Sequence, residues 1–294
     1  MEGFFVLEEY FLMFTKKDMK IHSFLGLIAS LTLFFASCSN DENSSVSSPG
    51  NIVKKMKFVG LNWDNDFENH EIEFEYNNGK LTSYSDGTGL KVDFFYTNNL
   101  ITHVDKYIRE NQQSTLYFSA NFFYDSLDRL EKFEVDEYPV SQPDINVSVN
   151  FTYVDNNNAN FTYTSFYENY SGSVTFDVNN VNKLVKNNFD TNYNSSAKEY
   201  YMSYDSKKHI LSDIIGFRNL NLYNAFYFDD FYNFRGLGLY PGGKNNLTTL
   251  QIKLFYNGYL SSEGISNVIN YQYGSNDFPI EAAKNSQSKM LFEF

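Results

Sequence analysis

Residues Glu71–Tyr84, with the sequence EIEFEYNNGKLTSY, contain the pattern that decides the fold. Apolar and acidic side chains alternate at its start, and successive side chains of a β-strand point to opposite faces of a sheet. Asn77-Asn78-Gly79 then interrupts the alternation, and an Asn-Gly pair between two such runs is typical of a tight hairpin turn. The stretch therefore predicts a β-hairpin with an apolar face, formed by Ile72, Phe74 and Tyr76, and an acidic face, formed by Glu71, Glu73 and Glu75.

Variants of this hairpin recur to the end of the chain, at intervals of roughly 26 residues. Each has apolar residues at alternate positions, most often ending in tyrosine, followed by a polar turn. The last residues of these copies are Tyr76, Tyr96, Tyr124, Tyr153, Val178, Tyr204 and Tyr256, and the longest gap has room for a degenerate copy near Phe226–Asp230. Period-2 alternation indicates half-buried antiparallel strands, and no stretch shows convincing helical periodicity.

Composition supports the same fold class. Among 294 residues there are 30 Phe and 24 Tyr, which are residue types enriched in strands. We therefore predict an all-β protein, an antiparallel meander of repeated hairpins that forms a large curved sheet, a half-barrel or a closed barrel. The net charge of −13 argues against nucleic acid as a partner, although solubility alone would also explain it.

The N-terminal part reads as a targeting segment. Met19-Lys20 opens a short basic region, and Phe24–Phe35 is an apolar run too short to span a membrane as a helix. Phe35-Ala36-Ser37-Cys38 follows and resembles the lipobox of bacterial lipoproteins, in which the signal peptide is removed and the cysteine is acylated. Cys38 is the only cysteine in the chain, so we expect it to carry the lipid. An ordinary signal peptide followed by an incidental cysteine is the alternative.

Four parts are predicted from this pattern. Residues 1–18 precede a signal that looks complete from Met19, so we expect a start codon placed too far upstream at Met1. Residues 19–37 form the signal peptide, 38–51 the lipidated cysteine with a flexible tether, and 52–294 a single β-repeat domain. Ser39-Asn40-Asp41-Glu42 resembles the surface-export signal of Bacteroidetes lipoproteins. We therefore expect an outer-membrane location, anchored by lipid, with exposure at the cell surface if that signal operates.

One hairpin carries a more specific resemblance. Tyr124-Asp125-x-x-Asp128-Arg129-Leu130 resembles the YD repeat, with Asp128 where that repeat has glycine, and aspartate tolerates the left-handed turn conformation. With Lys244-Asn245-Asn246 and Tyr271-Gln272-Tyr273, residues 52–294 resemble a family of uncharacterised Bacteroidetes lipoproteins. The resemblance implies a porin-like antiparallel barrel fold and no assigned activity. Asp125-Ser126-Leu127 also resembles the O-glycosylation acceptor of Bacteroidetes, which makes Ser126 a candidate acceptor.

Residues for catalysis are sparse. The sequence has no Gly-x-Ser-x-Gly motif and no histidine cluster of metal-ligand spacing, so we predict no catalytic, cofactor-binding or metal-binding residue and no cofactor. Asp136-Glu137 and Asp229-Asp230 are paired acids of the kind that glycoside hydrolases use, which leaves a glycan hydrolase as a minor alternative. Asp64-x-Asp66-x-Glu68 alternates oxygen ligands but lacks the glycine and late glutamate of a calcium loop.

A binding or structural role is the main hypothesis. Phe95, Phe123 and Tyr227 fall opposite the apolar stripe or in ambiguous positions, where they would either join a two-sided core or present an aromatic face to a glycan or a protein. An integral outer-membrane β-barrel channel is the alternative, because Met290-x-Phe292-x-Phe294 resembles the aromatic C-terminal signal of such barrels. Alternation alone does not say which face points inward.

Overall fold

The computed structural model describes residues 52–59, 71–87, 89–110, 113–138, 145–177, 180–190, 195–226, 243–283 and 289–294. The predicted extension, signal peptide and tether, Cys38 included, lie outside these residues, as do the candidate calcium loop and Tyr227. Seventeen strands make up one sheet. They are β1 (Lys55–Val59), β2 (Glu71–Asn77), β3 (Lys80–Ser85), β4 (Lys91–Thr97), β5 (Leu100–Glu110), β6 (Gln113–Tyr124), β7 (Leu130–Glu137), β8 (Ile145–Tyr153), β9 (Asn158–Ser165), β10 (Asn169–Asp177), β11 (Asn180–Asn187), β12 (Ser196–Lys208), β13 (Asn245–Tyr256), β14 (Tyr259–Val268), β15 (Asn270–Tyr273), β16 (Pro279–Ala283) and β17 (Lys289–Glu293).

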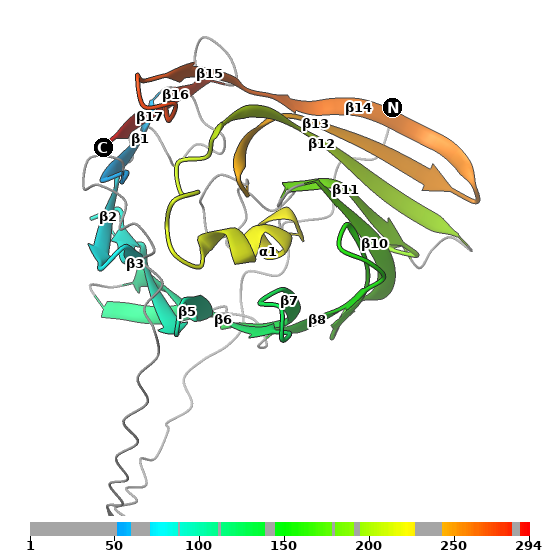
Figure 1. Ribbon diagram of the computed structural model, residues 1–294. Coiled ribbons are helices and arrows are strands. Elements are labelled where there is room, and N and C mark those ends of the chain that lie inside the picture. The colour runs from blue at the N-terminus through cyan, green and yellow to red at the C-terminus, as the bar shows by residue number, and fades with distance from the viewer. Residues whose placement is uncertain are drawn as a thin grey trace, which may run out of the picture. The chain divides into compact units, whose positions relative to one another are not determined.

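The strands form an antiparallel meander, as the sequence predicts. Neighbours in the sheet are neighbours in the chain from β1 to β14 and again from β15 to β17. The first strand, β1, also pairs with the last, β17, from Lys55 opposite Glu293 to Val59 opposite Lys289. The sheet therefore curves round on itself (Figure 1), with its ladder interrupted only where β14 passes into β15 across Ile269.

The hairpin of β2 and β3 shows how the alternation is used. Ile72 and Phe74 are buried, whereas Glu73 and Glu75 are exposed on the other face, and Glu71 pairs with Lys55 of β1 at 2.7 Å. The turn between the strands has positive φ at both central residues, +50° at Asn78 and +76° at Gly79, as a tight hairpin turn requires. In this hairpin, apolar side chains thus face the inside of the curved sheet, and the exposed carboxylates face the outside.

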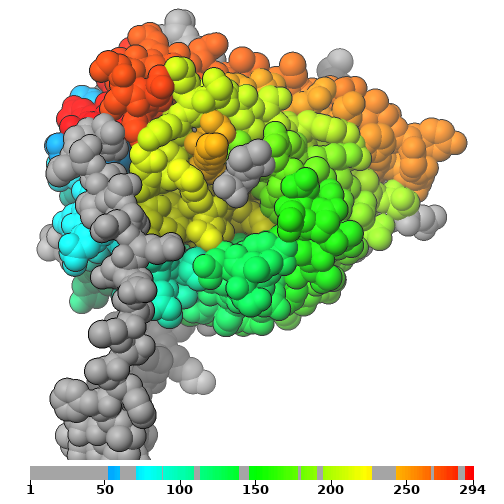
Figure 2. Space-filling view, in the orientation of Figure 1, coloured from blue at the N-terminus to red at the C-terminus, as the bar shows by residue number. Residues whose placement is uncertain are grey.

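The inside is filled by a helical segment that the sequence did not predict. Residues 209–226, which we call the plug segment, contain a 3-10 helix, η1 (Phe217–Leu220), and a short helix, α1 (Asn221–Phe226). All six residues of α1 are buried, and the strands surround this helix (Figure 1). Figure 2 shows yellow atoms of this segment within the region that the strands enclose.

Aromatic rings join α1 to the inner face of the sheet. Tyr223 packs edge-on against Phe122 and Phe133, with ring centroids 5.0 and 5.1 Å apart. Phe226 packs edge-on against Phe161 at 4.8 Å. The predicted strand copy near Phe226–Asp230 is therefore wrong at Phe226, because that residue ends a helix, and its remainder lies outside the described residues.

Candidate functional site

The turns that follow β2, β4, β6, β8 and β10 lie at one end of the sheet, because successive strands run in opposite directions. We call this the plug end, since the plug segment contacts three of these turns. Ile215 N donates to Gly79 O at 3.2 Å, and Asn219 Nδ2 donates to Asp128 O at 2.7 Å. A side chain placed at Gly216, which has φ +78°, would meet Asn99 O at 2.7 Å, so the backbones approach closely there.

The β6–β7 turn is held by Asp125. Its Oδ1 accepts hydrogen bonds from the backbone N–H groups of Leu127 and Arg129 at 2.9 and 3.0 Å, and its Oδ2 accepts from Arg129 Nε at 2.8 Å. Burial alone would raise the pKa of the Asp125 carboxyl, but the hydrogen bonds from Arg129 and Leu127 bring it below its usual value. Asp128 has φ +59°, so it does adopt the left-handed conformation expected of it. The resemblance to the YD repeat thus rests on residues with clear turn-forming roles.

Arg129 connects this turn to the next hairpin through a contact with Tyr153. Its guanidinium carbon lies 3.9 Å from the ring centroid of Tyr153, which is within cation–π range. The Tyr153 hydroxyl donates to Leu130 O at 3.1 Å, and its ring stacks with Phe176 of β10 at 6.2 Å. Burial raises the pKa of Tyr153 to about 12, so this hydroxyl remains a donor at neutral pH.

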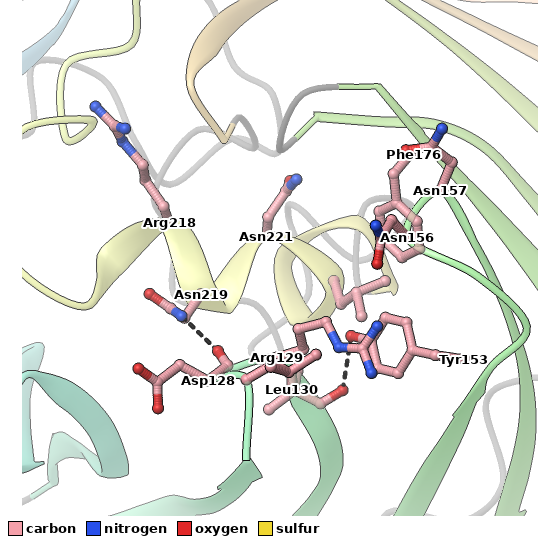
Figure 3. A pocket seen from close by; sticks show the side chains of 12 residues that line it. Asp128, Arg129, Leu130, Tyr153, Asn156, Asn157, Phe176, Arg218, Asn219 and Asn221 are labelled. Atoms are coloured by element: carbon pink, nitrogen blue, oxygen red, sulfur yellow. Dashed lines mark hydrogen bonds between the residues drawn. The ribbon is translucent and has the colours of Figure 1, made fainter. Parts of the chain in front are cut away.

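A cavity of about 450 Å³ lies between these turns and the plug segment. Figure 3 shows the amides, guanidinium groups and aromatic rings that surround it. Four separate parts of the chain contribute to the lining, so no local sequence motif predicts this cavity. The lining residues are Leu127, Asp128, Arg129, Leu130, Tyr153, Asn156, Asn157, Phe176, Arg218, Asn219, Asn221 and Leu222.

A second cavity, of about 570 Å³, lies on the other side of the β10–β11 turn and is lined in part by Asp177, Asp205 and Lys244. The Lys244-Asn245-Asn246 motif builds one wall. Asn180 Oδ1 accepts from the backbone N–H groups of Lys244 and Asn245 at 3.1 and 3.2 Å, and Asn180 Nδ2 donates to Asn245 Oδ1 at 2.9 Å. The motif therefore fastens the start of β13 to the start of β11.

Asp205 in this second cavity is fully engaged in structure. Its carboxylate accepts hydrogen bonds from the N–H groups of Lys207 and Asn246, from Asn246 Nδ2 and from the Tyr273 hydroxyl. Asp136 and Glu137 of β7 do not converge either, because adjacent strand residues point to opposite faces and Glu137 is the buried one. The acids named as a hydrolase pair thus lack the shared site that such chemistry needs, and Asp229-Asp230 lies outside the described residues.

A lysine and a glutamate are buried on the inner face of the sheet, away from the cavities. Lys106 of β5 lies opposite Phe118 of β6, which lies opposite Glu137 of β7, and all three are buried. Burial lowers the pKa of Lys106 to about 8, and the charge of Glu137 acts against this decrease. Sequence alternation cannot reveal this pair, because it depends on which strands become neighbours.

The predicted aromatic face is found in part. Phe95 and Phe123 are 47% and 44% exposed, on the outer face of the sheet. Phe95 lies 5.3 Å from the ring of His103, and Lys132 Nζ lies 5.3 Å from the ring centroid of Phe123. Neither residue lines the cavities at the plug end. Ser126 is exposed in the β6–β7 turn, so its candidate role as an acceptor stays a prediction.

No group of three or more His, Cys, Asp or Glu side chains in the described part of the chain is placed to hold a metal ion. No helix among the described residues combines the length and apolar character needed to cross a membrane.

The solved structures to which this chain is similar include two porin-like proteins. The crystal structure of a porin-like protein from Bacteroides vulgatus, at 2.80 Å resolution, is 13% identical, with a TM-score of 0.47 over 83% of this chain and 98% of that chain. A porin-like protein from Bacteroides uniformis, at 2.32 Å, is 12% identical, with a TM-score of 0.41 over 83% of this chain and 97% of that chain. No protein-family model and no curated protein matches the sequence.

Proposed function

We propose that the protein is a non-catalytic binding module of the outer membrane, tethered by a lipid on Cys38. The observation that supports this most is the direction of the sheet's two faces. Apolar residues such as Phe74 and Phe133 are buried on the inside, where Phe133 packs against α1, whereas Glu73, Glu75 and Lys91 are exposed on the outside. An exterior of this kind suits water, and a protein that faces water needs a separate anchor to stay at a membrane.

The integral channel requires the opposite arrangement. A membrane barrel presents an apolar band to lipid and a polar interior, and a charged side chain on the lipid face costs about 2–4 kcal/mol at the midplane. The residues proposed as its C-terminal signal also point inward, since Met290 and Phe292 are buried. These features favour the tethered module over the channel.

The hydrolase alternative is weaker for a chemical reason. A glycosidase of the usual kind needs two carboxylates on either side of the bond it breaks. The cavity of Figure 3 has one carboxylate in its lining, that of Asp128. A binding role needs no such pair.

Fractionation of a Gram-negative host that expresses the full-length chain tests the proposal. We expect the wild-type chain to incorporate labelled palmitate and to sediment with outer membranes, and Cys38→Ala to lose both properties. Cys38→Ser would serve as a second variant of similar size. If Cys38→Ala stayed in the membrane after a carbonate wash, the protein would be an integral one. Absence of label on the wild type would remove the lipid anchor.

A further inference from the structure

We propose that the cavity of Figure 3 binds an uncharged saccharide. This inference rests on the proposed role as a binding module and names the site and the ligand class for it. The cavity, of about 450 Å³, falls within the range of about 300–1,000 Å³ that is usual for small-molecule sites. Its walls come from the β6–β7 turn, the β8–β9 turn, β10 and the plug segment.

The polar part of the lining is dominated by amides. Asn156, Asn157, Asn219 and Asn221 all line the cavity (Figure 3). A carboxamide carries both donors and an acceptor, so it matches a hydroxyl group, which both donates and accepts. The backbone N–H of Asn157 donates to Asp155 Oδ1 at 2.7 Å, whereas the side-chain amides of Asn156 and Asn157 make no hydrogen bond to another described residue and are available to a ligand.

The two arginines of the lining are already paired with carboxylates. Arg129 is paired with Asp125, whose Oδ2 lies 2.7 Å from its Nη2. Arg218 donates through Nε to Ser212 O at 2.6 Å, and its Nη2 lies 3.7 Å from Asp213 Oδ1. The remaining carboxylate, that of Asp128, would repel an anion. The cavity therefore favours a neutral ligand over a carboxylate or a phosphate.

The apolar part of the lining is an aromatic pair. Phe176 is half-buried and stacks on Tyr153 with an interplanar angle of 23°, while Arg129 covers Tyr153. The face of an aromatic ring is negative, and the C–H groups of a sugar ring carry a slight positive charge, so the two attract. A hydroxylated ring with one apolar face matches this combination of amides and aromatic surface.

The walls are held in place before any ligand arrives. Asn219 Nδ2 donates to Asp128 O at 2.7 Å and ties the plug segment to the β6–β7 turn, while the Tyr153 hydroxyl is fixed on Leu130 O (Figure 3). A rigid site loses less conformational freedom on binding, which raises affinity for a given set of contacts.

Saturation-transfer NMR on the full-length chain tests the inference, with the methyl glycosides of glucose, galactose, mannose and N-acetylglucosamine as probes. We expect transfer to at least one of them, unchanged by added salt because no net charge is involved. Asn156→Ala and Phe176→Leu should each weaken binding about tenfold, the loss expected for one or two contacts. Asn150→Ala, on the outer face, and Phe166→Leu, in the exposed turn after β9, are matched controls outside the cavity lining and should bind like the wild type.

Transfer to none of the four glycosides would overturn the inference, as would equal binding by Asn156→Ala and the wild type. Stronger binding of methyl galacturonoside than of the galactoside would show that the ligand is an anion instead. If Phe176→Leu failed to fold, Asn156→Ala would still decide the question, because Asn156 is an exposed turn residue. Each of these results leaves palmitate labelling unaffected, so failure here is distinct from failure of the lipid anchor.

Discussion

The tyrosine hydroxyls at the plug end form a repeated set of hydrogen bonds to the backbone. Tyr204 donates to the buried Val181 carbonyl at 2.8 Å, and the same bond recurs where strands of other hairpins meet. In four of the five cases the donor follows the acceptor by 23 residues, and in the fifth by 24. The set is Tyr76 to Val53, Tyr124 to Ile101, Tyr153 to Leu130, Tyr204 to Val181 and Tyr271 to Leu247. The repeated tyrosine therefore ties the end of one strand to the strand before it.

Tyr204→Phe should lower the free energy of unfolding by about 1–3 kcal/mol, because it leaves a buried carbonyl without its donor. Tyr96 provides an internal comparison. Its buried hydroxyl has no hydrogen-bond partner among the described residues. In urea titrations, Tyr96→Phe should thus lower the free energy of unfolding by well under half as much as Tyr204→Phe. Equal losses in the two variants would mean that ring packing, not the hydrogen bond, explains the repeat.

Which tyrosines belong to this set could be read from the sequence only in part. Alternation predicts Tyr76, Tyr124, Tyr153, Tyr204 and Tyr256 alike as residues at strand ends, so it does not tell which of them join the set. Tyr256 ends β13 at the opposite end of the sheet, and Tyr271 takes the hydrogen-bonding position instead. Alternation has the same appearance in both chain directions, so it cannot say at which end a strand's last residue lies. In β10 the ring that stacks on Tyr153 is that of Phe176, and Val178, the predicted last residue of this copy, lies outside the described residues.

Single elements were predictable where their signals are local. The hairpin of β2 and β3 follows from six alternating residues and an Asn-Gly turn, all within reach of one another in the chain. The helix α1 has no such signal, because all six of its residues are buried and an all-round buried helix has no polar face to give a 3.6-residue period. Its existence depends on the space that the strands leave, which is a property of the assembled sheet.

The hydrogen bonds that join the start of β11 to the start of β13 can be tested by substitution of Asn180. Asn180 is buried and makes three hydrogen bonds to the start of β13, two as acceptor and one as donor. Asn180→Ala removes all three and should lower the free energy of unfolding by about 2 kcal/mol or more, since the lost partners are partly buried. Amide hydrogen exchange should rise at Lys244 and Asn245 before it rises elsewhere. Asn187→Ala, at the exposed other end of β11, is the control and should change neither measurement.

Across the whole molecule, the curved sheet and its filled interior follow from the difference between the apolar and the polar face of each hairpin. The apolar faces of the hairpins must leave water, and they do so by turning toward one another and toward α1. The sequence indicated that such a face exists, since the alternation runs through nearly every strand. It did not indicate the cavity of Figure 3, because Asp128, Tyr153, Phe176 and Asn219 meet only after the hairpins have closed round the plug segment.

Phe226→Ala tests whether the interior is packed. Phe226 is 3% exposed and contacts aromatic rings of β7, β8, β9 and β10. If the inside of the sheet is a core, truncation should leave a void and lower the free energy of unfolding by about 3–5 kcal/mol, with an intermediate loss for Phe226→Leu. Phe123→Ala, on the outer face, should cost far less, because its ring is already 44% exposed. A water-filled interior predicts a small loss of stability for Phe226→Ala, because water would fill the space left at position 226 without a large penalty. A loss below about 1 kcal/mol for Phe226→Ala in urea titrations would therefore favour a channel over the tethered, filled module.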